Sequence, residues 1–318
     1  MKSLLQRCRT LLLCGLLLAG AAHAADRPRD GATPSAPPVP LLWKVSGKEG
    51  AALYLLGSFH LLRSKDYPLA PEVEAAFGQS SKLLFELPPD EVESPALAAL
   101  MLQAAQRRDG RSLRDDLAPA QWQALQDYAA QHGLDLASMA GVKVWFVALG
   151  ISLQEMSRQG LDPALGLDRH FMQQAERTGK PAGGLETASE QIRLLDGMAL
   201  EEQRQMLAEA LDDARDGSRQ SRELHDAWRA GDAQRLWSGM AAEMKQRYPA
   251  LYRSINVERN DRWVPQLVQR LQAGQGTTLV VVGALHLLGR DGVVEKLRAR
   301  GYRVERVCAA CPAQAAGE

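Results

Sequence analysis

The sequence of 318 residues lacks several features that would assign it to a familiar class. The charges of its 38 basic and 38 acidic residues cancel, so the chain lacks the excess of positive charge that nucleic-acid binding requires. It contains no Gly-x-Ser-x-Gly, phosphate-binding loop, Gly-x-Gly-x-x-Gly or His-Glu-x-x-His motif. These absences argue against a nucleic-acid binder, an elbow-type serine hydrolase, a nucleotide-binding enzyme and a His-Glu-x-x-His metalloprotease.

Long apolar runs are also scarce, and the clearest one stands at the start of the chain. Residues 10–22 are almost wholly apolar, follow Lys2, Arg7 and Arg9, and precede Ala22-His23-Ala24. This order predicts a secretory signal peptide over residues 1–24, because the run is too short to span a bilayer. A retained anchor is the alternative. The mature chain of 294 residues then has 35 basic and 38 acidic residues, and we expect it to be periplasmic or secreted without stable membrane insertion.

Cysteine is nearly absent from the mature chain. Only Cys308 and Cys311 remain, close to the C-terminus. In an exported protein this spacing predicts a local disulfide that pins the tail, or free thiols. A redox-active pair usually opens a helix after a strand, and a zinc site would need further cysteines, so both are less favoured.

The order of the elements predicts a single domain over residues 41–310. A proline-rich flexible leader precedes it at 25–40, and a disordered tail follows at 311–318. Apolar runs predict strands at both ends of the domain, and apolar residues at three- and four-residue spacing predict helices between them. The expected strands are 41–45 and 51–56 as a hairpin, 82–87, 181–185, 278–282 and 302–307; the expected helices are 71–78, 94–108, 119–131, 140–159, 165–178, 200–213, 222–230, 233–247, 257–273 and 292–300. The fold class is therefore α/β: a central mixed sheet from the N- and C-terminal segments with a helical insertion at about 90–260.

A repeated motif is the most informative feature of the chain. Residues 53–62 read Leu-Tyr-Leu-Leu-Gly-Ser-Phe-His-Leu-Leu, and residues 279–288 read Leu-Val-Val-Val-Gly-Ala-Leu-His-Leu-Leu. A glycine at the end of a buried strand permits a sharp turn, so His60 and His286 should lie on loops at the carboxyl edge of the sheet. Two such loops could bring both imidazoles to one metal ion, although either histidine alone could be a hydrogen-bonded loop residue.

Two carboxylates also follow predicted strands. Glu86 ends the strand 82–87, where a buried carboxylate must be paired or metal-bound, unless it points to solvent at the rim. Glu186 follows the strand 181–185 and could instead be a first-turn residue of the next helix. We expect Glu86 to complete a metal set with His60 and His286, and Glu186 to orient water or act as general base.

The remaining candidates are weaker. Among Arg253, Arg259 and Asn260 near the start of a helix, an arginine could stabilise developing negative charge, or simply belong to a solvated helix end. Asp168 is explained by helix capping alone. Ser58 is replaced by Ala284 in the second motif, which argues against it as an obligatory nucleophile.

Other histidines and tryptophans receive no functional role from the sequence. Three histidines are expected on polar helical faces, and three tryptophans at helical spacing are expected in the core. They are His132, His170 and His225, and Trp228, Trp237 and Trp263.

Six segments in order along the chain carry a family resemblance. They are residues 54–60, 85–87 (Phe-Glu-Leu), 166–168 (Gly-Leu-Asp), 184–187 with Gln191, 259–260 (Arg-Asn) and 282–289. The ordered set resembles the TraB/GumN family, which includes the animal TIKI proteins, over about residues 41–307. The bacterial GumN-like branch is the most similar.

The resemblance implies an α/β fold related to the erythromycin esterase and ChaN-like group, with the paired Gly-x-x-His motifs as a metal or catalytic centre. TIKI proteins are regarded as metal-dependent proteases that trim a secreted signalling protein and favour manganese or cobalt. TraB-like members are linked to the shutdown of peptide pheromones, and GumN to polysaccharide-export genes.

We therefore expect an exported metal-dependent hydrolase, of the peptidase type, that acts on a peptide or protein. Its divalent ion, manganese or cobalt favoured and zinc possible, would be held by His60, His286 and Glu86, with Glu186 and Arg259 assisting. The alternatives are a non-catalytic periplasmic protein that binds a peptide or glycan, and an accessory factor in polysaccharide export.

Overall fold

A computed structural model describes residues 36–274 and 276–311 of the chain, and six of its strands form one mixed sheet. The strand order is β4-β3-β5-β2-β1-β6. The strands are β1 (Leu42–Ser46), β2 (Ala52–Ser58), β3 (Lys82–Phe85), β4 (Ala182–Gly184), β5 (Thr277–Gly283) and β6 (Arg303–Arg306). The predicted signal peptide, most of the predicted leader and residues 312–318 lie outside the described residues.

The pairing of the strands confirms the predicted α/β class and the sheet built from both ends of the chain. β1 and β2 form the expected antiparallel hairpin, while β2, β5, β3 and β4 run parallel to one another. Every residue of β2 is buried, as are six of the seven in β5, which explains their continuous apolar sequence. β4 comes from within the predicted helical insertion, so the insertion returns once to the sheet.

Helices make up most of the chain between β3 and β5, and others precede β3 or follow β5. They are α2 (Pro71–Gln79), α3 (Pro89–Val92), α4 (Pro95–Ala105), α5 (Pro119–His132), α6 (Val144–Arg158), α7 (Leu167–Thr178), α8 (Ala188–Asp196), α9 (Leu200–Arg215), α10 (Arg219–Arg229), α11 (Ala233–Leu236), α12 (Glu243–Arg247), α13 (Pro249–Tyr252), α14 (Glu258–Gln272), α15 (Ala284–Leu287) and α16 (Val293–Arg298). Short 3-10 helices include η3 (Ser64–Asp66) and η6 (Pro163–Leu165). The segments η7 (Trp237–Ala242) and η8 (Arg253–Val257) are π-helical. No helix in the described part of the chain is both long and apolar enough to cross a bilayer.

Two of the predicted helices differ from the observed ones, one in where it begins and one in its continuity. The helix expected from residue 140 begins at Val144, because backbone bonds tie the preceding residues to the end of α4: Lys143 N donates to Ala105 O and Arg107 N donates to Gly141 O. The helix expected over residues 233–247 is interrupted by η7.

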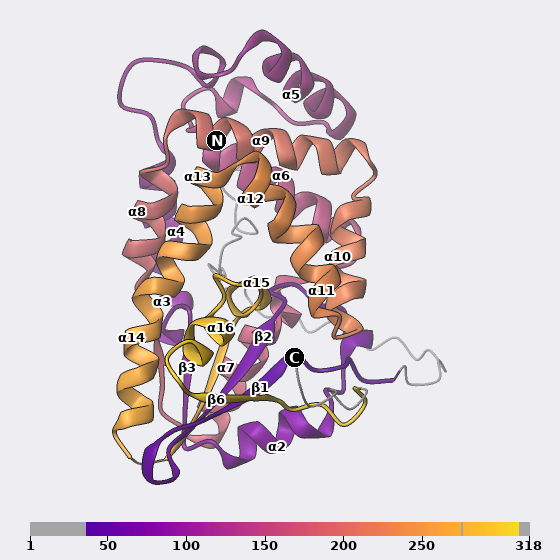
Figure 1. Cartoon of the computed structure of the whole chain (residues 1–318). Helices are drawn as coiled ribbons and strands as arrows, with labels where there is room; N and C mark the ends of the chain where they lie inside the picture. The colour runs from indigo at the N-terminus through magenta and orange to yellow at the C-terminus, as the bar shows by residue number, and fades with distance from the viewer. Residues whose placement is uncertain (1–35, 275, 312–318) are drawn as a thin grey trace.

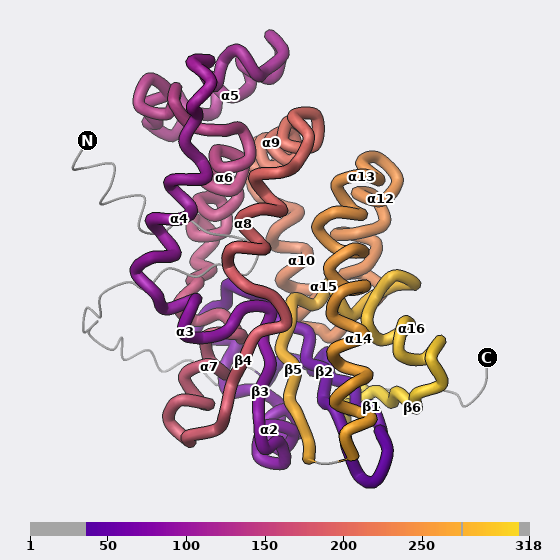
Figure 2. Tube along the Cα trace, turned by 90° about the vertical axis from the view of Figure 1, so that its left-hand side faces the viewer, coloured from indigo at the N-terminus to yellow at the C-terminus, as the bar shows by residue number. Residues whose placement is uncertain are grey.

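The helices stand mainly beyond the carboxyl ends of the parallel strands (Figures 1 and 2). In both views α5 lies far from the sheet with α6 and α9 beneath it, while α2 and α7 lie beside the strands. A buried apolar cluster of its own joins α5, α6 and α9, through residues such as Leu125, Val147 and Leu207. The carboxyl ends of the parallel strands therefore face the helices (Figures 1 and 2).

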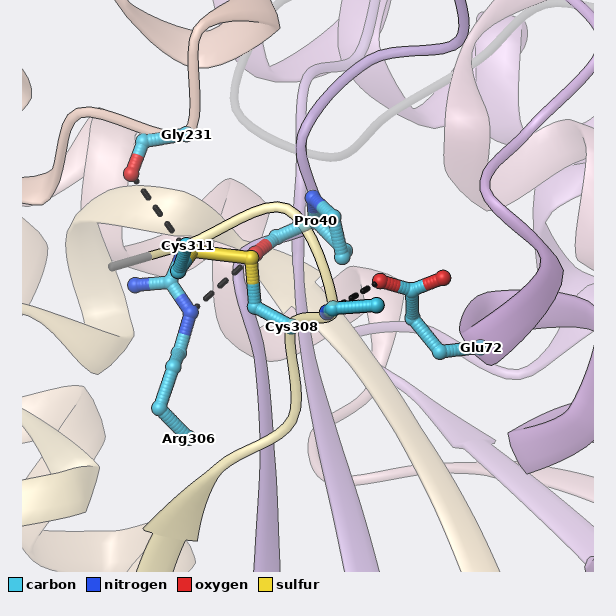
Figure 3. Close-up of a disulfide and its surroundings, with 7 residues drawn as sticks. Pro40, Glu72, Gly231, Arg306, Cys308 and Cys311 are labelled. Atoms are coloured by element: carbon cyan, nitrogen blue, oxygen red, sulfur yellow. Dashed lines mark hydrogen bonds between the residues drawn. A yellow bond between two sulfur atoms is a disulfide. The ribbon is translucent and has the colours of Figure 1, made fainter. Parts of the chain in front are cut away.

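Cys308 and Cys311 form the predicted disulfide just after the last strand (Figure 3). The Cα atoms of Cys308 and Cys311 are 5.4 Å apart. Beside them, Ala309 N donates to the carboxylate of Glu72 at 2.8 Å, which ties the tail to α2.

The end of the predicted leader lies against the folded body. Nε of Arg306 donates to the carbonyl of Pro40 at 3.1 Å, and Val39 N donates to Arg229 O at 2.9 Å. Pro40 is buried. Contacts with the domain thus begin a few residues before residue 41, where the sequence predicts order.

Candidate functional site

The two Gly-x-x-His motifs leave neighbouring strands at the same edge of the sheet. In the parallel register of β2 with β5, Ser58 lies opposite Gly283. A Cβ on Gly57 would lie 3.2 Å from the Cα of Ala284, and one on Gly283 would lie 3.2 Å from Nε2 of His60. Neither glycine has a positive φ, contrary to the sharp-turn expectation. The motifs need glycine because they approach each other closely.

Both imidazoles face the carboxylate of Glu86. Its Oε1 lies 3.9 Å from Nε2 of His60 and 3.9 Å from Nε2 of His286, and it accepts a hydrogen bond from Gly283 N at 2.8 Å. His60 is on a loop as expected, whereas His286 is within the one-turn helix α15. The side chain of His60 is 19% exposed, and those of Glu86 and His286 are buried. The sheet therefore brings together the three groups that the sequence predicts as metal ligands.

The other ring nitrogen of each histidine has its own partner. Nδ1 of His60 lies 2.7 Å from Oδ2 of Asp168, whose Oδ1 accepts from the hydroxyl of Ser58 at 2.9 Å. Nδ1 of His286 lies 2.8 Å from Oδ1 of Asn260. With both Nδ1 atoms engaged as donors, Nε2 of each ring faces Glu86 and is, in the neutral imidazole, the acceptor that a metal requires.

Asp168 is therefore more than the helix cap that the sequence suggests. It stands in the first turn of α7, but its carboxylate is buried and bonded to His60. We call the largely buried polar group at this sheet edge the centre; it consists of His60, Glu86, Asp168, Glu186, Arg259, Asn260 and His286. Gly166 makes this possible, because a Cβ there would overlap the carbonyl oxygen of His60. The signal available in the sequence is the Gly-Leu-Asp segment of the family resemblance.

Arg259, in the first turn of α14, connects the remaining groups. Its Nη1 lies 3.0 Å from Nε2 of His286, its Nη2 donates to Glu86 Oε2 at 2.5 Å, and its Nε donates to Glu186 Oε1 at 2.9 Å. Gln191 also donates to Glu186 Oε1, at 2.7 Å. Glu186 is thus held by Arg259 and does not face the histidines, which agrees with the preference for Glu86 as ligand.

Nearby charges shift the pKa values of the two histidines in opposite directions. Burial lowers the pKa of His60, but the charge and hydrogen bond of Asp168 and the charge of Glu86 raise it to about 9. Burial and the nearby Arg259 lower the pKa of His286 to about 3. For Glu86, burial raises the pKa, but Arg259 and both histidines outweigh it and hold the pKa well below its usual range.

The centre contains more buried negative than positive charge. Asp168, Glu86 and Glu186 are 4%, 3% and 7% exposed, and the buried permanent cation among them is Arg259. Arg262 reaches only to 3.8 Å from Glu186, with a side chain that is 49% exposed. Three carboxylates against one guanidinium leave a deficit of two positive charges when both imidazoles are neutral, and buried charges need compensation.

These residues fit a divalent ion in chemistry and nearly in spacing. Within residues 36–274 and 276–311, no three His, Cys, Asp or Glu side chains are already close enough together to hold a metal ion. The two Nε2 atoms are each 3.9 Å from Glu86 Oε1, whereas donors about 2.1 Å from one ion lie about 3.4 Å apart. Each of these two Nε2–Oε1 distances would have to shorten by about 0.5 Å. Gly283 leaves room for this shortening, provided that Arg259 releases His286.

Of the histidines set aside in the sequence, His225 is buried and His132 is largely buried, rather than exposed on polar faces. His225 is fully buried and its Nε2 lies 2.8 Å from Oδ2 of Asp66, because α10 turns this face towards η3. The His132 side chain is 9% exposed, with Nε2 4.0 Å from Oε1 of Glu155. Neither reaches the centre described above.

Trp263 is core, as predicted, but it also borders the centre. It is fully buried, its ring centroid lies 4.4 Å from that of His286, and its Nε1 donates to Oε2 of Glu186 at 3.3 Å. Arg253 is exposed on η8 and forms no hydrogen bond with these residues, so Arg259 rather than Arg253 joins the centre.

Residues 41–306 match the model of the TraB/PrgY/gumN family. The chain belongs to this family. Among curated proteins it is similar to the uncharacterized protein YbaP of Escherichia coli K12 and to that of Shigella flexneri, each 23% identical over 250 residues, or 77% of this chain and 87% of the relative. No solved structure matches significantly. In this family member the motif segments that carry the resemblance supply the residues of the centre.

Proposed function

We propose that this protein is an exported metal-dependent hydrolase of the peptidase type. The ligands of the divalent ion are Nε2 of His60, Nε2 of His286 and the carboxylate of Glu86. The observation that carries the proposal is the convergence of both motifs on one buried carboxylate, in a centre where three buried carboxylates surround one buried arginine. Manganese or cobalt is the favoured ion, and zinc is the third candidate.

Each residue of the centre has a role in this proposal. When bound, the ion would lower the pKa of a coordinated water and polarise a scissile carbonyl. Arg259 places a fixed positive charge beside Glu86 and His286, where it can stabilise negative charge that develops on the substrate. Glu186 orients the guanidinium through Nε and Nη2 and so assists indirectly. His60, the most accessible of these groups, marks the side from which substrate approaches.

The location and the fold relationship belong to the same proposal. Export is supported by the Cys308–Cys311 disulfide, since such bonds persist in oxidising compartments, and by the signal-peptide pattern of residues 1–24. A relationship to the erythromycin esterase and ChaN-like group is supported by the mixed sheet with histidines at the carboxyl ends of β2 and β5. The substrate class is a peptide or protein.

The test is the metal content of the purified mature protein beside that of the His60→Ala/His286→Ala double variant. We expect about one tightly held ion per chain in the wild type and none in the folded double variant. His170→Ala, a partly exposed helix histidine outside the centre, is the control and should retain the ion.

A peptide-cleavage screen with added manganese or cobalt follows on the same proteins. Cleavage by the wild type and the control, and its loss in the double variant, would support the peptidase assignment. A wild type that holds no ion after incubation with manganese, cobalt or zinc would contradict it and favour a non-catalytic binding protein.

A further inference from the structure

One of the positions at which the two copies of the motif differ has a structural counterpart. The residue after the glycine is Ser58 in the first copy and Ala284 in the second. Ser58 donates its hydroxyl hydrogen to Asp168, the partner of His60, while the partner of His286 is the uncharged Asn260. A serine thus accompanies the carboxylate partner and an alanine accompanies the amide partner.

We propose that Ser58 and Asp168 are a positioning pair that holds His60 through a charged contact, while Asn260 holds His286 through an uncharged one. The charged arm of the paired motif is then His60 with Asp168 and Ser58, and the neutral arm is His286 with Asn260. Its consequence for ion affinity rests on the proposed function, but the hydrogen-bond geometry does not.

The charged arm is built so that the carboxylate has one orientation. Oδ1 of Asp168 accepts from Ser58 and Oδ2 faces Nδ1 of His60, so each oxygen has a separate partner. The carboxylate is 4% exposed, which makes a charge-assisted bond to the imidazole stronger than the same bond in water. A carboxylate on Nδ1 also makes Nε2 a more basic ligand. Asp168 therefore affects the far side of the ring, where it makes no contact.

The neutral arm is fixed by a different device. Nδ2 of Asn260 donates to the carbonyl of Asp291 at 2.8 Å, which turns Oδ1 of the amide towards Nδ1 of His286. An aspartate at position 260 could not donate to the carbonyl of Asp291, because a carboxylate oxygen and a carbonyl oxygen are both acceptors and repel each other. The amide sets the tautomer of His286 without adding negative charge beside Arg259, which is 3.0 Å from the other ring nitrogen.

The experiment compares Asp168→Asn and Ser58→Ala with the wild type. Asp168→Asn keeps an acceptor for His60 but removes the charge, and Ser58→Ala removes the second anchor of the carboxylate. Asp261→Asn is the matched control, because Asp261 follows Asn260 in α14 but is exposed and pairs with Lys296. Unchanged thermal unfolding midpoints establish that each variant is folded.

The first readout is the proton NMR signal of the hydrogen-bonded Nδ1–H of His60 in metal-free protein, assigned by its loss in His60→Ala. We expect it to move upfield in Asp168→Asn, to move less in Ser58→Ala, and to stay in Asp261→Asn. The second readout is manganese affinity, which should fall about 10- to 100-fold in Asp168→Asn, as for other residues that orient metal ligands, and by a smaller factor in Ser58→Ala.

An unmoved His60 signal in folded Asp168→Asn would overturn the positioning pair. So would a manganese affinity unchanged from that of the wild type. If the wild type binds no manganese but the signal moves as expected, the positioning pair is supported and the proposed function fails, so the two failures are distinguishable.

Discussion

Nη1 of Arg259 lies 3.0 Å from Nε2 of His286, so a permanent cation occupies the ring nitrogen that the second motif directs at Glu86. The same guanidinium binds the carboxylates of Glu86 and Glu186. Arg259 therefore competes for one proposed ligand of the ion while it neutralises another. Ion binding and the stability of the centre are coupled through this one side chain.

Replacement of Arg259 by glutamine should destabilise the protein strongly. Glu86 and Glu186 would remain buried without their cation, and the loss of one partner of a buried ion pair costs about 3–5 kcal/mol. Urea unfolding measures the change in the free energy of unfolding. Arg262→Gln, whose half-exposed side chain lies farther from Glu186, is the control and should change stability by less than about 1 kcal/mol. A divalent ion should restore part of the loss in Arg259→Gln, and equal stability of the two variants would contradict the coupling.

Replacement of Gly283 by alanine should impair ion binding while the fold is retained. The new Cβ would lie 3.1 Å from Glu86 Oε1 and 3.2 Å from His60 Nε2, so these groups must separate. Overpacking of this kind costs about 1–3 kcal/mol, which equals about 5- to 150-fold in affinity. Titration with manganese measures the effect. Gly78→Ala is the control, since a Cβ there meets nothing within 4 Å, and its manganese affinity should equal that of the wild type.

Asp66 should make stability depend on pH in the acid range. Burial raises the pKa of Asp66, but hydrogen bonds from His225, the backbone of Arg63 and Arg229 outweigh it and lower the pKa. A lowered folded-state pKa gives stability that is present above the unfolded-state value of about 4 and is lost as the pH falls through the folded-state value.

The matching variant is Asp66→Asn. It should be about 2–3 kcal/mol less stable than the wild type near pH 7, because bonds to a charged group are lost, and the difference should shrink below about pH 4. Chemical unfolding at a series of pH values is the measurement. A difference that stays constant from pH 7 to pH 3 would show that the charge of Asp66 is not the cause.

Removal of the disulfide should loosen the tail and leave the centre intact. Cys308 and Cys311 are only three positions apart, so the bond closes a very short loop and contributes at most about 2 kcal/mol. In Cys308→Ser/Cys311→Ser we expect faster amide exchange at Ala309 and in β6, with metal content unchanged. A double variant that loses its ion would show that the tail supports the centre, against this expectation.

Local patterns in the sequence were sufficient for the elements that begin and end within one segment. The apolar run before Gly57 predicts β2, and the echo before Gly283 predicts β5, because a strand buried on both faces needs continuous apolar residues. The start of α6 at Val144 was not predictable in this way. It depends on Lys143 pairing with the end of α4, which is distant in sequence.

For the centre, the sequence by itself determined which residue types stand at the carboxyl ends of the strands: His60, Glu86 and His286. These positions follow from the strand pattern, since a polar group directly after a buried strand lies at the sheet edge. Only the tertiary structure decided the partners. Asp168 meets His60 across 108 positions, and Arg259 meets Glu86 across 173, because α7 and α14 pack against this edge. Such contacts depend on how distant segments pack, so no local periodicity records them.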